Sequence, residues 1–434
     1  MKGLLFERSL PRFAASRLVA SFGSGRGAGV SPLRLADLEQ PALPGDDWHR
    51  VQPRLSGICG SDLATIDGRS SRYFEELVSF PFVPGHEVVG TVPDGAVAAD
   101  GTALAAGARV VLEPVLGCRA RGLDPLCPAC AAGRTGDCEA VAFGHIRPGL
   151  QTGFCADTGG GWSSAGLVAH STQLHPVPEG LADEDAVTVE PLACAVHAVL
   201  AAAIDDGDVV AVIGAGTLGL AVTAALAQLA ARGRTAAPGA LVVGARYAHQ
   251  RRLATELGAT TALPEDQLAR AVRRRSRSLA LGPPGVGSLR LAGGADVVFD
   301  CVGSADSIAQ SLSIVRPRGK VVLVGMPGRT TVDLAGLWHR EVTLMGAYAY
   351  GTEHPGGEAV PTFDLAFEVA AAARTGRLLS ATYPLERFEE AVAHAGSAGR
   401  RGAVKIAFDL EATAPPPRSK DEDEDERTRR RRRS

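Results

Sequence analysis

Four cysteines gather in one short, glycine-rich segment of this 434-residue sequence. Two residues separate Cys127 from Cys130, seven separate Cys130 from Cys138, and eight separate Cys118 from Cys127. Soft thiolates at such spacing suit a tetrahedral Zn²⁺ ion with no coordination position left open. The spacing therefore predicts a structural zinc site in a loop at about residues 112–145. The alternative is a set of four free, buried thiols.

A second set of potential ligands is spread over three motifs. Cys59 lies in Gly-Ile-Cys-Gly-Ser-Asp, His86 and Glu87 lie in Pro-Gly-His-Glu, and Glu190 opens Glu-Pro-Leu-Ala-Cys. One sulfur, one imidazole and one or two carboxylates form a mixed set that leaves a position open for substrate. Each residue alone has an ordinary structural explanation, as a core thiol, a structural histidine or a surface acid. Their joint occurrence indicates a catalytic metal site.

A glycine-rich turn indicates a dinucleotide site. Gly214, Gly216 and Gly219 follow a predicted strand and open a predicted helix. In that context the first glycine permits a tight turn, the second lets a pyrophosphate approach the backbone, and the third allows close helix–strand packing. The start of the helix, at Thr217 and Leu218, offers free N–H groups to the phosphates. The alternative is a tight turn without a ligand.

The residue that ends the second strand of such a unit selects the cofactor. An acidic group there holds the ribose 2′-hydroxyl of NAD, whereas an arginine favours the 2′-phosphate of NADP. Here the strand ends in Gly-Ala-Arg, with Arg246 at the turn and no carboxylate beside it. The sequence therefore favours NADP over NAD. The alternative for Arg246 is an ordinary exposed residue at the start of a helix.

Short apolar strands alternate with helices in the middle of the chain. This alternation is typical of a doubly wound parallel sheet, hence of an α/β fold. The preceding part of the chain is richer in short β-like runs and turns. The predicted elements are strands at 209–213, 241–243, 296–300, 320–325 and 403–408, and helices at 218–231, 250–257 and 363–374.

Charge and composition narrow the classes of function. Lys and Arg number 45 against 48 Asp and Glu, and a formal net charge of −3 provides no basic field for nucleic acid.

The run 209–231 is uncharged, but its glycines and β-branched start favour a buried strand–turn–helix over a membrane span. Glu7 and Arg8 interrupt the first residues before any stretch long enough for a signal peptide, so we expect a cytoplasmic protein. Residues 411–434 combine an acidic and a basic block and are predicted to form a disordered tail.

Together these motifs resemble those of the zinc-dependent medium-chain dehydrogenases/reductases, the superfamily of alcohol, sorbitol, threonine and glucose dehydrogenases. The similarity runs from residue 1 to about residue 410 and includes the segments 294–303 and 318–325. It implies a Rossmann-type doubly wound parallel sheet inserted into a mostly β GroES-like catalytic domain. The implied units are a catalytic domain at 1–195, a dinucleotide-binding domain at 196–346 and a return to the catalytic domain at 347–410.

The resemblance also implies roles by position. Cys59 and His86 match the catalytic zinc ligands, and Glu87 matches a glutamate that binds zinc or exchanges with water. Glu190 falls at the third-ligand position, where a glutamate resembles the polyol and glucose dehydrogenases and binds zinc directly or through water. Ser61 matches the hydroxyl that takes the proton of the alcohol.

Further positions follow from the same resemblance. Asp62 matches the acid that orients the ligating histidine, and Cys194 is not expected to be a ligand. Lys405, near the last strand, either touches a cofactor phosphate or is solvated. Two departures stand out. The first is the eight-residue spacer after Cys118, where the family has two residues. The second is the absence of the relay histidine, in whose region Ala64 and Thr65 stand.

The expected activity is reversible oxidation of an alcohol or polyol with zinc and NADP or NAD. The loops at 70–78 and 347–355 are expected to form the substrate pocket. We expect a homo-oligomer, a dimer or tetramer, whose partner is a small-molecule alcohol or polyol and which binds neither nucleic acid nor membrane. The alternatives are a zinc-free enone or quinone reductase of the same fold and a cofactor-binding protein without turnover.

Overall fold

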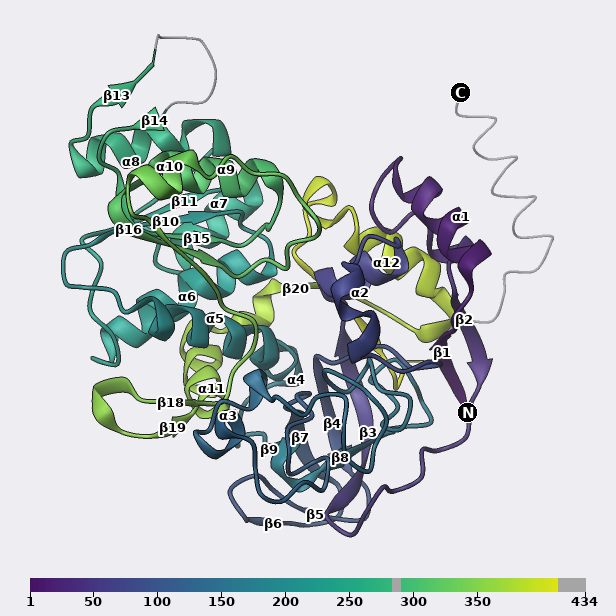
Figure 1. The fold of residues 1–434 in the computed structure, drawn as a ribbon. Helices are drawn as coiled ribbons and strands as arrows, with labels where there is room; N and C mark the ends of the chain where they lie inside the picture. Colours follow the sequence, from purple (N-terminus) through teal and green to yellow (C-terminus); the bar gives the residue numbers. More distant parts are fainter. Residues whose placement is uncertain (283–289, 413–434) are drawn as a thin grey trace, which may run out of the picture.

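The computed structural model describes residues 1–282 and 290–412, and most of its strands belong to two sheets (Figure 1). The first sheet has six strands, and every pair in it is parallel. The middle of the chain supplies all of them. In spatial order they are β12 (Thr261–Leu263), β11 (Ala240–Gly244), β10 (Val209–Ile213), β15 (Ala295–Asp300), β16 (Val315–Leu323) and β17 (Thr343–Gly346).

Helices cover both faces of this sheet, which explains why its strands are continuously apolar. On β10, Val210 and Val212 belong to the core shared with one set of helices, whereas Ala211 and Ile213 belong to the core shared with the other set. The first set is α5 (Val189–Ala202), α6 (Thr217–Ala231), α7 (Ala248–Glu256) and α11 (Thr362–Ala373), and the second is α8 (Leu268–Ser276) and α9 (Ala305–Ile314).

The strand order reverses between β10 and β15, which are neighbours in the sheet but far apart in the chain. In a parallel sheet the crevice for a ligand lies outside the carboxyl ends of the strands at such a point. Ile213 is in register with Asp300, and Asp300 is in register with Leu323, so the loops that follow these residues leave the sheet at one edge.

The second sheet has seven strands and combines both ends of the chain. Strand β21 near the carboxyl end pairs with β3, with Ala407 opposite Gly57. In spatial order the strands are β20 (Leu379–Tyr383), β21 (Lys405–Asp409), β3 (Trp48–Gly57), β4 (Val88–Val92), β7 (Ala108–Leu112) and β9 (Leu174–Pro176), and β8 (Leu167–His170) also pairs with β3.

The remaining elements are short. Four two-stranded pairs are β1 (Lys2–Phe6) with β2 (Leu33–Asp37), β5 (Ala96–Val97) with β6 (Ala103–Leu104), β13 (Ala280–Leu281) with β14 (Arg290–Leu291), and β18 (Thr352–Glu353) with β19 (Val360–Pro361). The other helices are α1 (Leu10–Ala20), α2 (Gly60–Ile66), α3 (Pro128–Ala131), α4 (Asp183–Ala186), α10 (Ala335–His339) and α12 (Phe388–Ala395).

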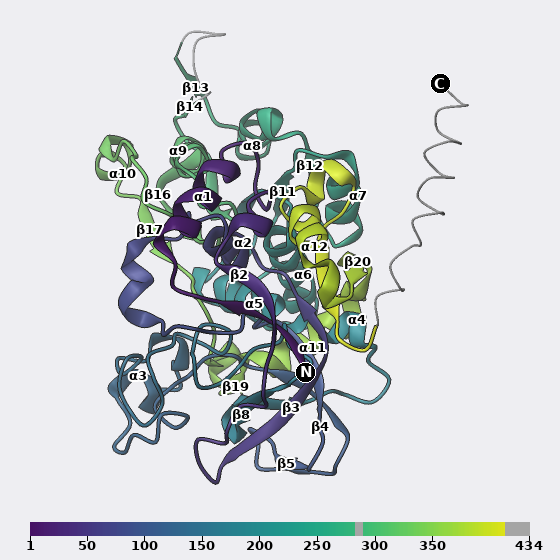
Figure 2. The same cartoon turned by 90° about the vertical axis from the view of Figure 1, so that its right-hand side faces the viewer.

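The strand and helix predictions agree with the structure in kind and differ at their ends. The uncharged run 209–231 is the strand β10 followed by α6, as expected. Strand β16 begins five residues before the predicted 320–325. Helix α1, which lies on the side facing the viewer in Figure 2, was not predicted. Its Leu10 and Leu18 are exposed, so they give no buried periodic face. Within the described residues no helix has the length and apolarity that a bilayer crossing requires. Most of the predicted tail, 413–434, lies outside the described residues.

A buried carboxylate joins three elements near the return of the chain. Glu353 pairs with His197 of α5 (Oε1 to Nδ1, 2.8 Å) and accepts a hydrogen bond from Thr362 of α11 (2.9 Å). Burial raises the pKa of Glu353, but these two partners more than offset that effect, so its pKa lies below the ordinary value. A carboxyl with a lowered folded-state pKa stabilises the fold above its ordinary pKa and loses this contribution as the pH falls through the folded-state pKa.

Glu353→Gln is therefore expected to lower the free energy of unfolding at pH 7 by roughly 1.5–3 kcal/mol, the range for a hydrogen bond to a charged group. The difference from the wild type should shrink as the pH is lowered below the ordinary glutamate pKa. Urea unfolding at several pH values measures this difference. Glu358→Gln is the matched control, because Glu358 forms an exposed ion pair with Arg234 that contributes little. A Glu353→Gln deficit that stays constant with pH would contradict the assignment.

Candidate active site

One cavity of about 2320 Å³ runs between the two sheets. This volume exceeds that of an ordinary small-molecule pocket, and it suits a dinucleotide together with a second ligand. All five predicted catalytic residues line the cavity, and so do four of the six predicted cofactor-binding residues. These lining residues are Cys59, Ser61, His86, Glu87, Glu190, Gly216, Thr217, Leu218 and Arg246.

Helix α2 positions the first predicted ligand. Cys59 is the residue that caps the start of α2, and its N–H donates to Oδ2 of Asp62 (2.8 Å). The other oxygen of Asp62, Oδ1, lies 3.5 Å from Nδ1 of His86. One buried carboxylate therefore fixes the cysteine segment and faces the histidine ring. This arrangement agrees with the orienting role predicted for Asp62.

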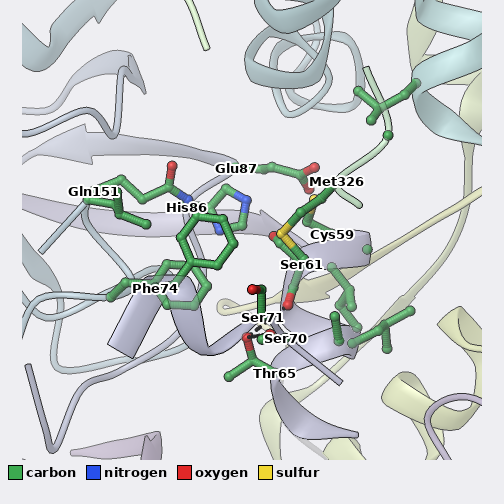
Figure 3. A pocket seen from close by; sticks show the side chains of 18 of the residues that line it. Cys59, Ser61, Thr65, Ser70, Ser71, Phe74, His86, Glu87, Gln151 and Met326 are labelled. Carbon is green, nitrogen blue, oxygen red and sulfur yellow. Dashed lines mark hydrogen bonds between the residues drawn. The ribbon is translucent and has the colours of Figure 1, made fainter. Parts of the chain in front are cut away.

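Cys59, His86 and Glu87 come together in the wall of the cavity (Figure 3). One ligand atom from each of the three lies within 4.8 Å of the others. His86 and Glu87 are 3% and 1% exposed. Burial lowers the pKa of His86, but the charges of Asp62 and Cys59 outweigh it and hold this pKa well above the ordinary value. The half-buried sulfur of Cys59 and the buried nitrogen and oxygen of its two partners, in such proximity, fit the ligand preferences of zinc.

Lys405 is the partner of Glu87 that sequence reasoning missed. Its Nζ contacts Oε2 of Glu87 and donates to the carbonyl oxygen of Ile58 (3.2 Å). Lys405 is 1% exposed, so the solvated alternative is wrong. The two side chains meet over Gly57 at the end of β3. Any side chain at Gly57 would collide with both of them, so glycine is required at this position. The signal in the sequence was a lone lysine in an apolar strand, which must have a buried anion beside it.

Glu190 faces the cavity from α5 and falls outside the three-residue group. Its Oε1 accepts a hydrogen bond from the hydroxyl of Tyr350 (2.9 Å). Burial raises the pKa of Glu190 to about 7, and the charge of His86 opposes that shift. Tyr350 was not singled out from the sequence, although it lies in the loop 347–355 predicted to form the pocket. Cys194 lies one turn after Glu190 on α5 and also lines the cavity.

The glycine-rich turn has the predicted backbone geometry. Gly214 has φ +86°, which a residue with a side chain rarely adopts, and a Cβ atom on Gly219 would collide with the carbonyl oxygen of Gly214. Gly216 is the residue before α6, so the free N–H groups of this helix open toward the cavity. Arg246 also lines the cavity, and its mostly exposed guanidinium lies 3.4 Å from the carboxylate of Glu265.

All four cysteines of the thiol loop come together, including Cys118. The Sγ atoms of Cys118 and Cys138 are 3.7 Å apart. Four sulfurs at about 2.3 Å from one zinc ion in a tetrahedron are about 3.8 Å from one another. The thiol loop therefore has the dimensions of a closed zinc site.

The eight-residue spacer of the thiol loop has a structural role. It contains Arg121, whose side chain is fully buried. The Arg121 guanidinium donates to the carbonyl oxygens of Leu116 (3.0 Å), Phe143 (3.0 Å) and Gly149. These bonds tie the spacer to both ends of the loop, and they explain how the long spacer still delivers Cys118 to the other thiols.

Two family models match the chain. The model described as an alcohol dehydrogenase GroES-like domain matches residues 45–179, and the model described as a zinc-binding dehydrogenase matches residues 221–364. Together they include strands of both sheets and the segments that carry Cys59, His86, Glu87 and the thiol loop.

The chain belongs to the zinc-dependent medium-chain dehydrogenases.

Similar proteins support the assignment. A sorbitol dehydrogenase of Arabidopsis thaliana is 30% identical over 331 residues, which are 75% of this chain and 80% of the relative. A probable D-xylulose reductase A of Aspergillus clavatus is 28% identical over 75% of this chain and 81% of the relative. The crystal structure of a putative zinc-binding dehydrogenase from Sinorhizobium meliloti bound to NADP has a TM-score of 0.62 and 26% identity, and it covers 87% of this chain and 95% of its own.

These findings confirm several predictions. They confirm the family, the GroES-like and Rossmann-type fold and the oxidoreductase class. They also support the prediction that the protein uses zinc and a nicotinamide cofactor. The choice between NADP and NAD and the full ligand sets stay predictions.

The thiol loop generates a direct test. The wild-type dehydrogenase should contain about two zinc ions per chain, one in the closed tetrathiolate site and one in the open site. Cys118→Ser should lower this number to about one, because a structural site that loses one of four thiolates binds its metal far less tightly. Cys155→Ser is the matched control, since Cys155 is buried beside the loop but lies outside the group of four. Elemental analysis that finds the same zinc content in all three proteins would exclude Cys118 as a ligand.

Proposed function

We propose that this chain oxidises a secondary hydroxyl group of a polyol or sugar-like alcohol, reversibly, with NADP preferred over NAD. One observation carries the proposal. The group formed by Cys59, His86 and Glu87 and the phosphate-binding start of α6 line the same cavity. Metal ligands and a dinucleotide-binding turn in one cavity are what hydride transfer from a metal-activated alcohol requires.

The bound zinc would polarise the substrate oxygen, and the nicotinamide would accept the hydride. The chain itself supplies the remaining functions. Cys59, His86 and Glu87 would hold the metal, with Lys405 offsetting the charge of Glu87. Ser61 lines the cavity at the start of α2 and would take the proton of the alcohol. Because His86 and Glu87 are buried, this part of the wall limits the access of bulk water and orients the reacting groups.

The substrate class is supported by the relatives and by the cavity wall. The two relatives named above are a sorbitol dehydrogenase and a D-xylulose reductase. Polar groups stand in the wall around the ligand group, among them Glu190, Gln151 and the hydroxyl of Tyr348, which donates to Gln151 at a distance of 3.5 Å. These polar groups can form hydrogen bonds with several hydroxyl groups of one substrate. An apolar pocket would leave those hydroxyl groups without hydrogen-bond partners.

A panel of polyols, sugar acids and simple secondary alcohols, each assayed with NADP and with NAD, tests the proposal. We expect turnover of at least one polyol-like substrate and loss of that turnover, without loss of cofactor binding, in His86→Ala. Turnover of enones or quinones by zinc-free protein would instead support the zinc-free reductase. Cofactor binding without turnover of any substrate would support the non-catalytic alternative.

The preference for NADP has its own test. Arg246→Asp should lower kcat/KM for NADP roughly ten- to hundred-fold, the effect of losing a charge-assisted hydrogen bond. The same change should leave kcat/KM for NAD equal or higher, because an acidic group there can hold the ribose hydroxyl. Arg252→Asp is the control, since Arg252 is exposed and pairs with Glu256 on the surface of α7. Equal losses with both cofactors would contradict the role of Arg246.

A further inference from the structure

The burial of the ligand group poses a problem of proton transfer. Oxidation of an alcohol releases the hydroxyl proton where His86 and Glu87 are almost fully buried. Among the described residues that line the cavity, His86 is the single imidazole, and it belongs to the metal-ligand group. No second histidine of the described cavity wall is available to carry the proton from Ser61 to water.

A line of hydroxyl groups lies along α2 and the loop that follows it. Thr65 is one helical turn after Ser61, and its Oγ1 is 2.9 Å from the carbonyl oxygen of Ser61. The same Oγ1 is 3.0 Å from Oγ of Ser70, and either oxygen can be the donor (Figure 3). All three residues are half-buried and line the cavity, and Arg69, next to Ser70, is exposed.

The loop is folded so that Ser70 faces Thr65 independently of this side-chain bond. The N–H groups of Arg69 and Ser70 both donate to the carbonyl oxygen of Ala64, at 2.7 and 3.2 Å, which bends the chain back onto the end of α2. Ser71 differs from Ser70, because its Oγ accepts the N–H of Tyr73 and so caps the next turn. The hydroxyls of Thr65 and Ser70 thus bond to each other, and a backbone group takes only part of their hydrogen-bonding capacity.

We propose that Thr65 and Ser70 carry the proton from Ser61 to the solvent at residues 69–72. This proposal rests on the proposed function. The alcohol proton passes to Oγ of Ser61 while Ser61 gives up its own hydroxyl proton, and a bridging water hands that proton to the Thr65–Ser70 pair. Each hydroxyl accepts one proton and releases one, so all return to their initial state. The net change is one proton delivered to water for each hydride transferred to the nicotinamide.

The experiment compares the wild-type holoenzyme with Thr65→Val, Ser70→Ala and Thr65→Ser. The first readout is the rate of proton release, followed with a pH indicator, after the zinc-loaded protein is mixed with oxidised cofactor and no alcohol. With no alcohol present, water in the substrate position would supply the proton, and the arriving positive charge of the nicotinamide favours loss of that proton. The second readout is the solvent-deuterium isotope effect on kcat with the best substrate of the panel. Zinc content and KM are measured for each protein.

Thr65→Val and Ser70→Ala should each slow proton release and kcat on the order of ten-fold, a modest part of what proton-transfer groups contribute. The isotope effect should rise, while zinc content, KM and the total protons released stay unchanged. Thr65→Ser keeps the hydroxyl and should behave as the wild type, and added imidazole should restore the rate of the other two.

Wild-type rates and isotope effects in both Thr65→Val and Ser70→Ala would overturn the relay while leaving the proposed function intact. So would a Thr65→Ser protein as slow as Thr65→Val, because that result assigns the threonine methyl group a packing role. A wild-type protein that holds zinc and cofactor but turns over no alcohol of the panel would overturn the proposed function, and the relay with it.

Discussion

The buried carboxylate of Asp62 links the two chain segments on which the site depends. One oxygen accepts the N–H of Cys59, and the other faces the ring of His86. A cysteine at the start of α2 and a histidine before β4 are 27 positions apart in the sequence, and this carboxylate holds them in one place. A ligand pair fixed in this way does not have to be ordered when the metal binds, which lowers the entropic cost of binding. The roles proposed for the cavity, the cofactor turn and the hydroxyl groups of α2 all depend on this Cys59–His86 pair.

The buried pair of Lys405 and Glu87 stabilises the same region from the other side. A buried ion pair contributes little net stability, but removal of either partner leaves an uncompensated charge and is costly. The pair spans three neighbouring strands, β21, β3 and β4, so it ties the returning end of the chain to the segment that carries His86. Because β21 follows the Rossmann-type sheet in the chain, the catalytic site is complete only after the whole described chain has folded.

Local patterns in the sequence were sufficient for some features and insufficient for others. The glycine turn, the thiol spacing and the strands around 209–300 depend on neighbouring residues, and their predictions agree with the structure. The partners of Glu87 and Glu190 lie 318 and 160 positions away, and no local pattern indicates such contacts. The role of Arg121 was missed for a related reason, because its backbone carbonyl partners are brought together only by the folded loop. The domain limits near residues 195 and 346, the cytoplasmic location and the oligomeric state stay predictions.

Anomalous X-ray diffraction at the zinc edge, from crystals of the holoenzyme with bound cofactor, tests the central claim most directly. The account predicts one peak within about 2.3 Å of the sulfur of Cys59 and about 2.1 Å of a ring nitrogen of His86, the usual zinc–ligand distances. That peak should lie beside the nicotinamide ring, and a second should lie among the four thiols. A zinc peak in the thiol loop alone, with the nicotinamide bound next to an empty Cys59–His86 pair, would contradict the account.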